Sequence, residues 1–148
     1  MVAYSFRPRF VDPISTGTKR QTIRAYRSGR SRHAVPGEAL QLFTGMRTAQ
    51  CKLIGTATAE AVYPVQLFFG AHIRRGYSKS WSSTNTDPRF ATYPTYAREC
   101  NAFAREDGFK DWKELEAFWA KEHEGVDVFE GVLIRWRDFE ANDRRPAA

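Results

Sequence analysis

The sequence lacks the features of a secreted or membrane-spanning protein. It has only two cysteines in 148 residues and no apolar run of the roughly 18 residues that a membrane helix needs. Its first residues do not follow the charged-then-apolar order of a signal peptide. Cys51 and Cys100 form no Cys-x-x-Cys pair, which suits a reducing compartment. We therefore expect a cytoplasmic protein that does not associate with membranes.

Several catalytic signatures are absent as well. The three histidines, His33, His72 and His123, are scattered and lack HExxH or Cys/His ligand spacing. Phosphate-binding loops of the GxxxxGK[ST] or GxGxxG kind and a Ser nucleophile elbow are also missing. The sequence therefore predicts no metal and no cofactor, and any hydrolysis would use metal-free acid–base or covalent chemistry.

The charge that is present is unevenly distributed. Residues 1–100 carry 15 Lys+Arg and 5 Asp+Glu, whereas residues 101–148 carry 8 and 12, and the whole chain has a formal net charge of +6. Arg dominates the basic half, and its planar guanidinium suits phosphate groups and base edges. This asymmetry predicts a basic face for an anionic partner, most simply nucleic acid. A solvated surface without a partner is the alternative.

The length and the pattern of apolar residues predict one α+β domain. Residues 1–137 are enough to bury one core. Several non-local strands with two late helices favour a small β-barrel capped by helices. Residues 138–148 are expected to form a flexible C-terminal tail. The expected elements are a helical turn over 10–16, strands over 20–26, 40–44 and 50–61, helices over 95–106 and 111–125, and a last strand over 126–136.

The two late helices carry further signals. Gly108 is placed as the stop of the first of them. Asp111 and Glu114 have the spacing of a capping box at the start of the second. The buried stripe of this second helix consists of Trp112, Leu115, Phe118 and Trp119.

Residues 76–94 are predicted to form a long polar loop. Basic and aromatic residues are interleaved in and beside it, a mixture that binds single strands through phosphate contacts and base stacking. They are Arg74, Arg75, Lys79 and Arg89 together with Tyr77, Trp81, Phe90 and Tyr93. The alternative is that these aromatic residues only pin the loop onto the barrel.

The segment Gly17–Arg24 has the pattern Gly-x-Lys-x-x-Thr-x-Arg and carries the candidate chemistry. If its second half is extended, Lys19 lies near the start of the strand, and Thr22 and Arg24 share one face. A threonine oxygen can act as a nucleophile when a base removes its proton, and a lysine whose pKa is lowered by burial or by neighbouring arginines can be that base. A purely structural alternative stays open, in which the glycine caps a helix and the basic side chains protect a strand edge.

Three stretches of the sequence resemble the ASCH domain family, a branch of the PUA-like fold. They are Phe10, Ile14, Gly17, Lys19, Thr22, Ile23 and Arg24, then the turn Pro36-Gly37-Glu38-Ala-Leu-Gln-Leu, and later Glu106-Asp-Gly-Phe109 before a helix and a closing apolar strand. The resemblance covers residues 4–137. It implies a PUA-like β-barrel with a cleft between barrel and helices, and an association with RNA or other nucleic acid.

The resemblance also implies catalytic residues. One branch of the family removes the acetyl group of N4-acetylcytidine with a Lys, a Thr and a Glu, and Lys19 and Thr22 match the first two. The matching carboxylate is Asp107, one methylene shorter than Glu, and Glu106 is its neighbour. Ribonuclease activity is attributed to some bacterial members.

The basic residues around the motif predict a track for a polyanion longer than one nucleoside. The loop from Arg27 to His33 extends the positive charge away from the motif. The candidate nucleic-acid-binding residues are Arg20, Arg24, Arg27, Arg30, Arg32, Arg47, Lys52 and Trp81.

Three functions remain open at this point. The first is binding of RNA or single-stranded nucleic acid, or of a modified nucleoside, in a basic cleft. The second is an amidohydrolase that deacetylates N4-acetylcytidine-type nucleosides, and the third is a metal-independent ribonuclease. Residue spacing does not separate them, since a cleft that holds a base or a phosphate needs the same Lys, Thr and Arg as a catalyst.

Overall fold

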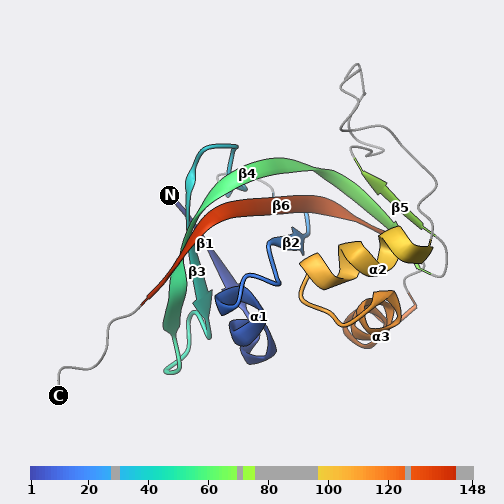
Figure 1. Cartoon of the computed structure of the whole chain (residues 1–148), viewed down its shortest axis with the longest axis horizontal. Helices are drawn as coiled ribbons and strands as arrows, with labels where there is room; N and C mark the ends of the chain where they lie inside the picture. The colour runs from blue at the N-terminus through green and yellow to red at the C-terminus, as the bar shows by residue number, and fades with distance from the viewer. Residues whose placement is uncertain (28–30, 70–71, 76–96, 126–127, 143–148) are drawn as a thin grey trace.

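The computed structural model describes residues 1–27, 31–69, 72–75, 97–125 and 128–142 (Figure 1). It confirms the α+β class, with helices and a mixed sheet in one chain. The elements are β1 (Val2–Phe6), the 3-10 turn η1 (Pro8–Phe10), α1 (Val11–Ser15), β2 (Gln21–Arg24), β3 (Ala39–Thr44), β4 (Lys52–Phe68), β5 (His72–Arg75), α2 (Ala97–Glu106), α3 (Trp112–Glu122) and β6 (Val128–Ala141).

The sheet is built on two long strands. β4 and β6 pair in antiparallel register from Gly55 with Ala141 to Phe68 with Val128, and both arch over the molecule (Figure 1). Two register shifts within residues 56–61 mark irregularities of the kind that bend and twist a strand. The strand order is β1-β3-β4-β6-β2, with β5 beside β4. The β1–β3 pair is parallel, and the other described pairs are antiparallel.

β1 and β2 lie at the two ends of the strand order and leave a seam between them. Within the described ranges no backbone hydrogen bond joins these two strands. The side chain of Arg24 in β2 spans the seam, since its Nη2 donates to the carbonyl oxygen of Ser5 in β1 at 2.7 Å. The sheet is therefore a half-barrel whose two edges are linked by a side chain.

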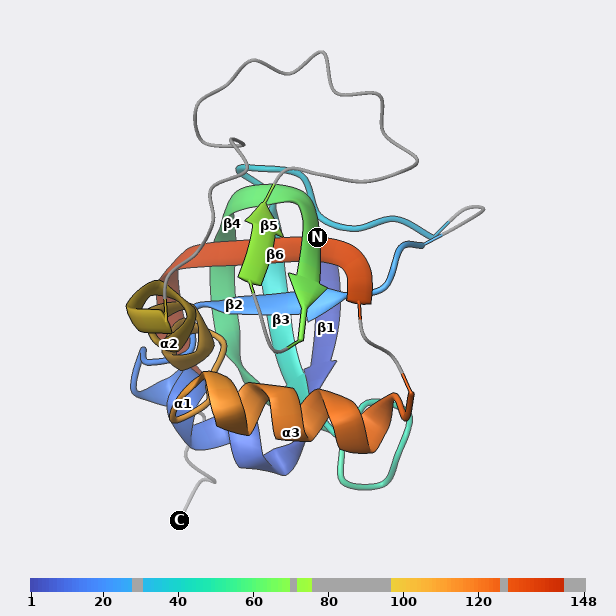
Figure 2. The same cartoon turned by 90° about the vertical axis from the view of Figure 1, so that its right-hand side faces the viewer.

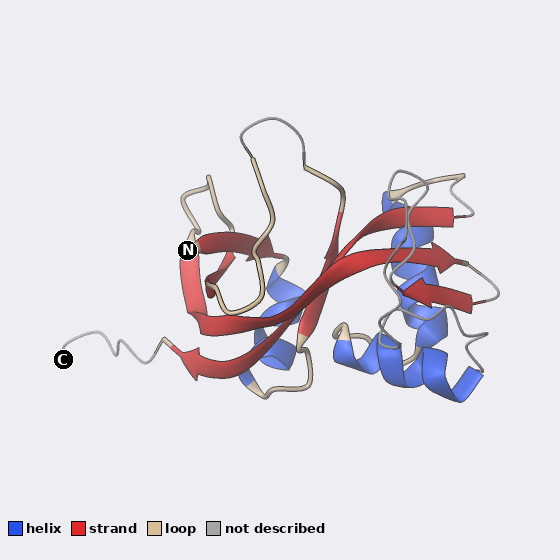
Figure 3. Ribbon diagram, turned by 90° about the horizontal axis from the view of Figure 1, so that it is seen from above, coloured by secondary structure: helices blue, strands red, loops and turns tan. Residues whose placement is uncertain are grey.

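α2 and α3 cover the end of the sheet where β4, β5 and β6 meet (Figure 2, Figure 3). The side chain of Asp111 accepts a hydrogen bond from the Glu114 amide at 2.9 Å, which confirms the predicted helix cap. The Trp119 ring lies 4.3 Å from Phe129 of β6 and 6.2 Å from Phe69, centroid to centroid. Aromatic packing thus attaches α3 to the sheet. None of the described helices is long and apolar enough to cross a membrane.

The predicted elements are found within the described residues, but two strands are longer than predicted. β4 continues beyond residue 61 to Phe68 because its second half pairs with both β6 and β5. β6 continues beyond residue 136 to Ala141, which corrects the predicted start of the tail at 138. Residues 137–141 are mostly exposed and polar, so they are held by backbone pairing with β4 and by Phe139, which packs against the core. The predicted loop 76–94 and residues 143–148 lie outside the described residues.

Gly131 provides a test of how closely β2 and β6 must approach. A methyl group at this position would lie 2.4 Å from the carbonyl oxygen of Arg24. We expect Gly131→Ala to displace β2 from β6 and to lower the free energy of unfolding by about 1–3 kcal/mol, measured by urea denaturation. Gly55→Ala is the matched control, because its clash with the Glu140 carbonyl oxygen affects the β4–β6 pair, at the end of β6 far from β2. Backbone NMR shifts in β2 should change only for Gly131→Ala, and an unchanged denaturation midpoint would contradict the expectation.

Candidate functional site

A pocket of about 220 Å³ lies at the seam between β1 and β2. Its walls come from these two strands, from η1, from the connection between α2 and α3, and from the C-terminal end of α3. Four of the residues that the motif and the resemblance predicted for the site line it together: Lys19, Thr22, Arg24 and Asp107. The fold thus brings residues 88 positions apart in the sequence, Lys19 and Asp107, into one site.

Lys19 is the most deeply buried cation of the site, with 3% of its surface exposed. Its Nζ donates to the main-chain carbonyl oxygen of Asp107 and lies 3.6 Å from Oδ1 of the same residue. The segment that carries Lys19 is fixed on both sides, since the Lys19 amide donates to the Pro13 carbonyl oxygen at 2.9 Å and the Arg20 amide donates to the Glu106 carbonyl oxygen at 2.8 Å. The lysine is therefore held against the end of α2 by backbone as well as side-chain contacts.

Gly108 allows the turn after α2 to approach Lys19. Its φ of +93° lies in the region that favours glycine. A Cβ at this position would lie 2.9 Å from Cδ of Lys19 and 3.0 Å from Cδ1 of Phe10. The glycine that the sequence analysis placed at the end of a helix therefore also makes room for the lysine.

Burial brings the pKa values of Lys19 and Asp107 closer together. It lowers the pKa of Lys19, although the neighbouring Asp107 carboxylate opposes that shift and the charge of Arg24 adds to it. Burial likewise raises the pKa of Asp107, against the opposing effect of Lys19 and Arg24. The free-energy difference between the ion pair and the neutral pair is therefore smaller than for the same groups in water.

Thr22 and Arg24 lie side by side on β2, as predicted. Nε of Arg24 donates to Oγ1 of Thr22 at 3.0 Å, which leaves the proton of the threonine hydroxyl available for another acceptor. The guanidinium lies 4.8 Å from the ring centroid of Phe6, and Nζ of Lys19 lies 5.6 Å from the same ring. Burial lowers the pKa of Arg24 to about 10, so the guanidinium stays charged at neutral pH.

Asp107 rather than Glu106 is the carboxylate of the pocket. The side chain of Glu106 turns toward β6, where its Oε2 accepts a hydrogen bond from Nη1 of Arg135 at 2.5 Å. Arg20 likewise points away, with its Nε donating to the Gly17 carbonyl oxygen at 3.0 Å. Arg20 and Arg135 line a second cavity of about 320 Å³ on this side of the motif.

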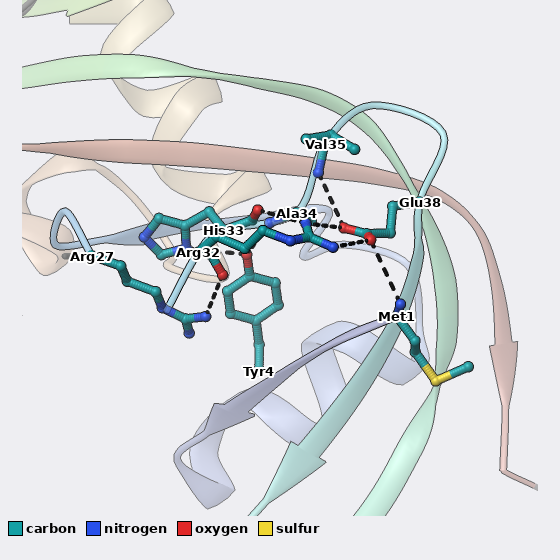
Figure 4. Close-up of polar contacts among 8 residues, drawn as sticks. All are labelled: Met1, Tyr4, Arg27, Arg32, His33, Ala34, Val35 and Glu38. Carbon is teal, nitrogen blue, oxygen red and sulfur yellow. Dashed lines mark hydrogen bonds and ion pairs between the residues drawn. The ribbon is translucent and has the colours of Figure 1, made fainter. Parts of the chain in front are cut away.

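The basic loop predicted to bind phosphate uses two of its arginines within the protein (Figure 4). Arg32 forms a bidentate salt bridge with Glu38, with N–O distances of 2.8 and 2.6 Å. This salt bridge lowers the pKa of Glu38 to about 2. Arg27 donates to the Arg32 carbonyl oxygen at 2.9 Å. His33 is linked to the Tyr4 hydroxyl at 3.1 Å and to the Ala25 carbonyl oxygen at 2.8 Å. These contacts hold Arg27, Arg32 and His33 in place and make both arginines less available to a polyanion.

The remaining predicted binding residues do not line the pocket. Arg47 and Lys52 are exposed at the turn between β3 and β4. Arg30 and Trp81 lie outside the described residues. In the ranges that the structure does describe, no three His, Cys, Asp or Glu side chains come together as a metal site would require.

The contribution of α3 to the pocket was not predicted from the sequence. Trp119 was predicted only as part of a buried stripe, yet it lines the pocket together with Phe118, Glu122 and His123. Arg7 of the β1–η1 connection forms an ion pair with Glu122, and Arg9 forms one with Glu114 at 2.7 Å. Local sequence held no signal for these contacts, because they depend on how a late helix packs on an early turn.

Lys19→Met tests the buried pair. We expect it to lower the free energy of unfolding by about 3–5 kcal/mol at pH 7, because Asp107 becomes a buried carboxylate without its cation. Burial raises the pKa of Asp107, so the folded protein favours the protonated form of this carboxyl group. The stability that its protonation contributes is complete at low pH and is lost as the pH rises through the pKa of the folded state. The variant should therefore lose less stability at pH 5 than at pH 7 in urea denaturation.

The control for this experiment is the double variant Lys19→Met/Asp107→Asn. It has no carboxylate to titrate at this site, so its loss of stability should not differ between the two pH values through this pair. An equal loss at both pH values for Lys19→Met alone would contradict the expectation.

Among known proteins, the chain is similar to several solved structures. No protein-family model and no curated protein matches the chain. The chain is similar to the ASCH protein of Zymomonas mobilis, with 15% sequence identity, a TM-score of 0.49 and coverage of 94% of this chain and 68% of that one. A tyrosine-to-phenylalanine variant of that protein gives 16% identity, a TM-score of 0.47 and coverage of 94% and 70%. A serine-to-alanine variant gives 15% identity, a TM-score of 0.47 and coverage of 94% of this chain and 68% of that one. These structural neighbours of the chain are ASCH domain proteins.

Proposed function

We propose that the chain binds a nucleobase, carried by a nucleoside or by RNA, in the pocket at the β1–β2 seam. The observation that carries this proposal is the convergence of Lys19, Thr22, Arg24 and Asp107 on one pocket of about 220 Å³. Pockets for drug-sized ligands typically measure ~300–1,000 Å³, so this volume suits a single ring better than a longer ligand.

The chemistry of the pocket walls suits a planar, polar ring. Phe10, Phe109 and Phe118 form a contacting aromatic group in the wall, with ring centroids 5.2–5.9 Å apart, and aromatic surfaces of this kind stack on bases. Arg24 and Asp107 add charged groups of opposite sign. Such groups bind the edges of bases through charge-assisted hydrogen bonds.

The charge outside the pocket bears on whether the base arrives as part of RNA. Residues 1–100 carry 15 Lys+Arg against 5 Asp+Glu, and the exposed Arg20, Arg47 and Lys52 remain candidates for phosphate contacts. Arg27 is engaged with the Arg32 carbonyl oxygen, and Arg32 with the Glu38 carboxylate. A base delivered by RNA would add phosphate contacts, whose contribution falls with salt, and a free nucleoside would not.

Binding can be measured with cytidine and with a short single-stranded RNA by isothermal titration calorimetry. We expect both to bind, and we expect only the RNA affinity to fall steeply between 50 and 200 mM salt. Arg24→Met should weaken cytidine binding by about tenfold or more, because it removes a buried charged donor. Arg105→Met, an exposed change on α2, is the control and should leave cytidine binding unchanged. Absence of cytidine binding to the folded wild-type protein would refute the proposal.

A second candidate function is hydrolysis of the exocyclic amide of an N4-acylated cytidine, and the buried Lys19–Asp107 pair favours it. The lowered pKa of Lys19 makes the neutral amine, which a general base requires, accessible at lower pH. Lys19 would take the proton of Thr22, the Thr22 oxygen would attack the amide carbonyl, and the amine would leave with a proton from Lys19. Water would then cleave the threonine ester, so that amide and water give amine and carboxylic acid.

This candidate predicts that N4-acetylcytidine is converted to cytidine and acetate, measured by chromatography. The rate should rise with pH through the lowered pKa of Lys19, because the neutral amine is the base. Lys19→Met and Thr22→Val should abolish turnover, whereas Arg105→Met should retain it. No product at high protein concentration would exclude this reaction. The ribonuclease hypothesis is tested separately, by measuring whether the protein cleaves labelled RNA in the presence of EDTA.

A further inference from the structure

Two atoms in the pocket walls are buried without a hydrogen-bond partner. In the described part of the chain three buried side-chain atoms have none, namely Oε1 of Gln66, Oδ1 of Asp107 and Nε1 of Trp119, and the latter two residues line the pocket. Buried polar groups in native proteins almost always have hydrogen-bond partners, so each exception calls for an explanation. Asp107 and Trp119 are only 4% and 8% exposed, so bulk water does not compensate.

The two atoms are chemically complementary. The indole N–H of Trp119 can only donate, and an ionised carboxylate oxygen of Asp107 can only accept. They also come from different elements, since Asp107 follows α2 and Trp119 lies near the end of α3. A group seated between these walls would meet a donor on one side and an acceptor on the other.

The Trp119 side chain is held in place by other contacts, so its N–H is not free to find a partner elsewhere. Its ring lies 4.3 Å from Phe129 and is stacked on His123 at 4.9 Å with an interplanar angle of 23°. Asp107 is fixed by Lys19, which contacts its carbonyl and its carboxylate. Oδ1 of Asp107 thus has an ion-pair contact with Lys19 at 3.6 Å but no hydrogen bond, and Nε1 of Trp119 has no hydrogen bond; both atoms belong to pre-positioned walls.

We infer that Trp119 and Asp107 select a ligand with an amide-like edge, in which a carbonyl or ring-nitrogen acceptor meets Nε1 of Trp119 and an N–H donor meets Oδ1 of Asp107. Cytosine, with its amino group beside ring and carbonyl acceptors, has such an edge, and this identification of the ligand rests on the proposed function. A ligand without one of these groups leaves Nε1 of Trp119 or Oδ1 of Asp107 without a hydrogen bond, which is how binding sites reject close analogues. Trp119 is a specificity-determining residue in this arrangement.

The experiment observes the indole N–H of Trp119 directly by ¹H–¹⁵N NMR of the full chain. The chain has four tryptophans, and the spectrum of Trp119→Phe assigns the signal. The probes are cytidine and acetamide, which have both donor and acceptor, and N4,N4-dimethylcytidine and N,N-dimethylacetamide, which lack the donor. We expect cytidine and acetamide to shift the Trp119 signal, and the dimethylated analogues to bind at least about tenfold more weakly.

Trp119→Phe should weaken cytidine binding by about tenfold or more. The matched control is Trp112→Phe, the same change on the same helix but outside the pocket, and it should leave cytidine affinity unchanged. If Trp119→Phe does not fold, the wild-type comparison between each probe and its dimethylated analogue decides the question.

The outcomes separate this inference from the proposed function. If acetamide shifts the Trp119 signal and cytidine does not bind, the inference stands and nucleobase binding fails. If cytidine binds with the Trp119 signal unmoved, or binds equally well to Trp119→Phe, nucleobase binding stands and the inference is overturned. If no probe moves the signal, the inference is likewise overturned.

Discussion

The contact between Lys19 and Asp107 is the interaction on which the rest of the site depends. It joins the segment before β2 to the turn after α2, and the lysine is almost fully buried by it. A buried charge pair of this kind adds little net stability, but loss of one partner is costly. The chain therefore gains a defined geometry at this position more than it gains free energy. Gly108 is part of the same constraint, because its missing side chain leaves room for the lysine.

The open edge of the half-barrel explains why a pocket exists there. In a closed barrel β1 and β2 would pair through their backbones, and the space between them would be filled. Here Arg24 links the strands through its side chain, and the aromatic rings of Tyr4 and Phe6 lie 5.3 and 4.8 Å from its guanidinium. The charged group that completes the fold is thus also one of the groups that a ligand would meet.

The sequence predicted the parts of the site that depend on local geometry. Thr22 and Arg24 could be placed side by side because alternate residues of a strand share a face, and the predicted cap at Asp111 is likewise local. Asp107 was reached only through the family resemblance, and Trp119 was assigned to the core alone. Arg32 was predicted to bind nucleic acid, and its ion pair with Glu38 was not predicted, although the two residues are only six positions apart. Contacts of α3 with η1 could not be predicted, since they require the tertiary packing.

The two sides of the pocket are held by contacts of unequal strength, because ion pairs from Arg7 and Arg9 join the start of η1 to α3. Arg7–Glu122 and Arg9–Glu114 are partly exposed to solvent, and surface pairs typically contribute about 1 kcal/mol or less. The side formed by Lys19, Asp107 and β2 is built from buried contacts that do not open without disturbing the core. If the pocket binds a ligand as proposed, these exposed ion pairs are the weakest contacts between its two walls, and the ligand would exchange with solvent more readily on the α3 side than on the half-barrel side.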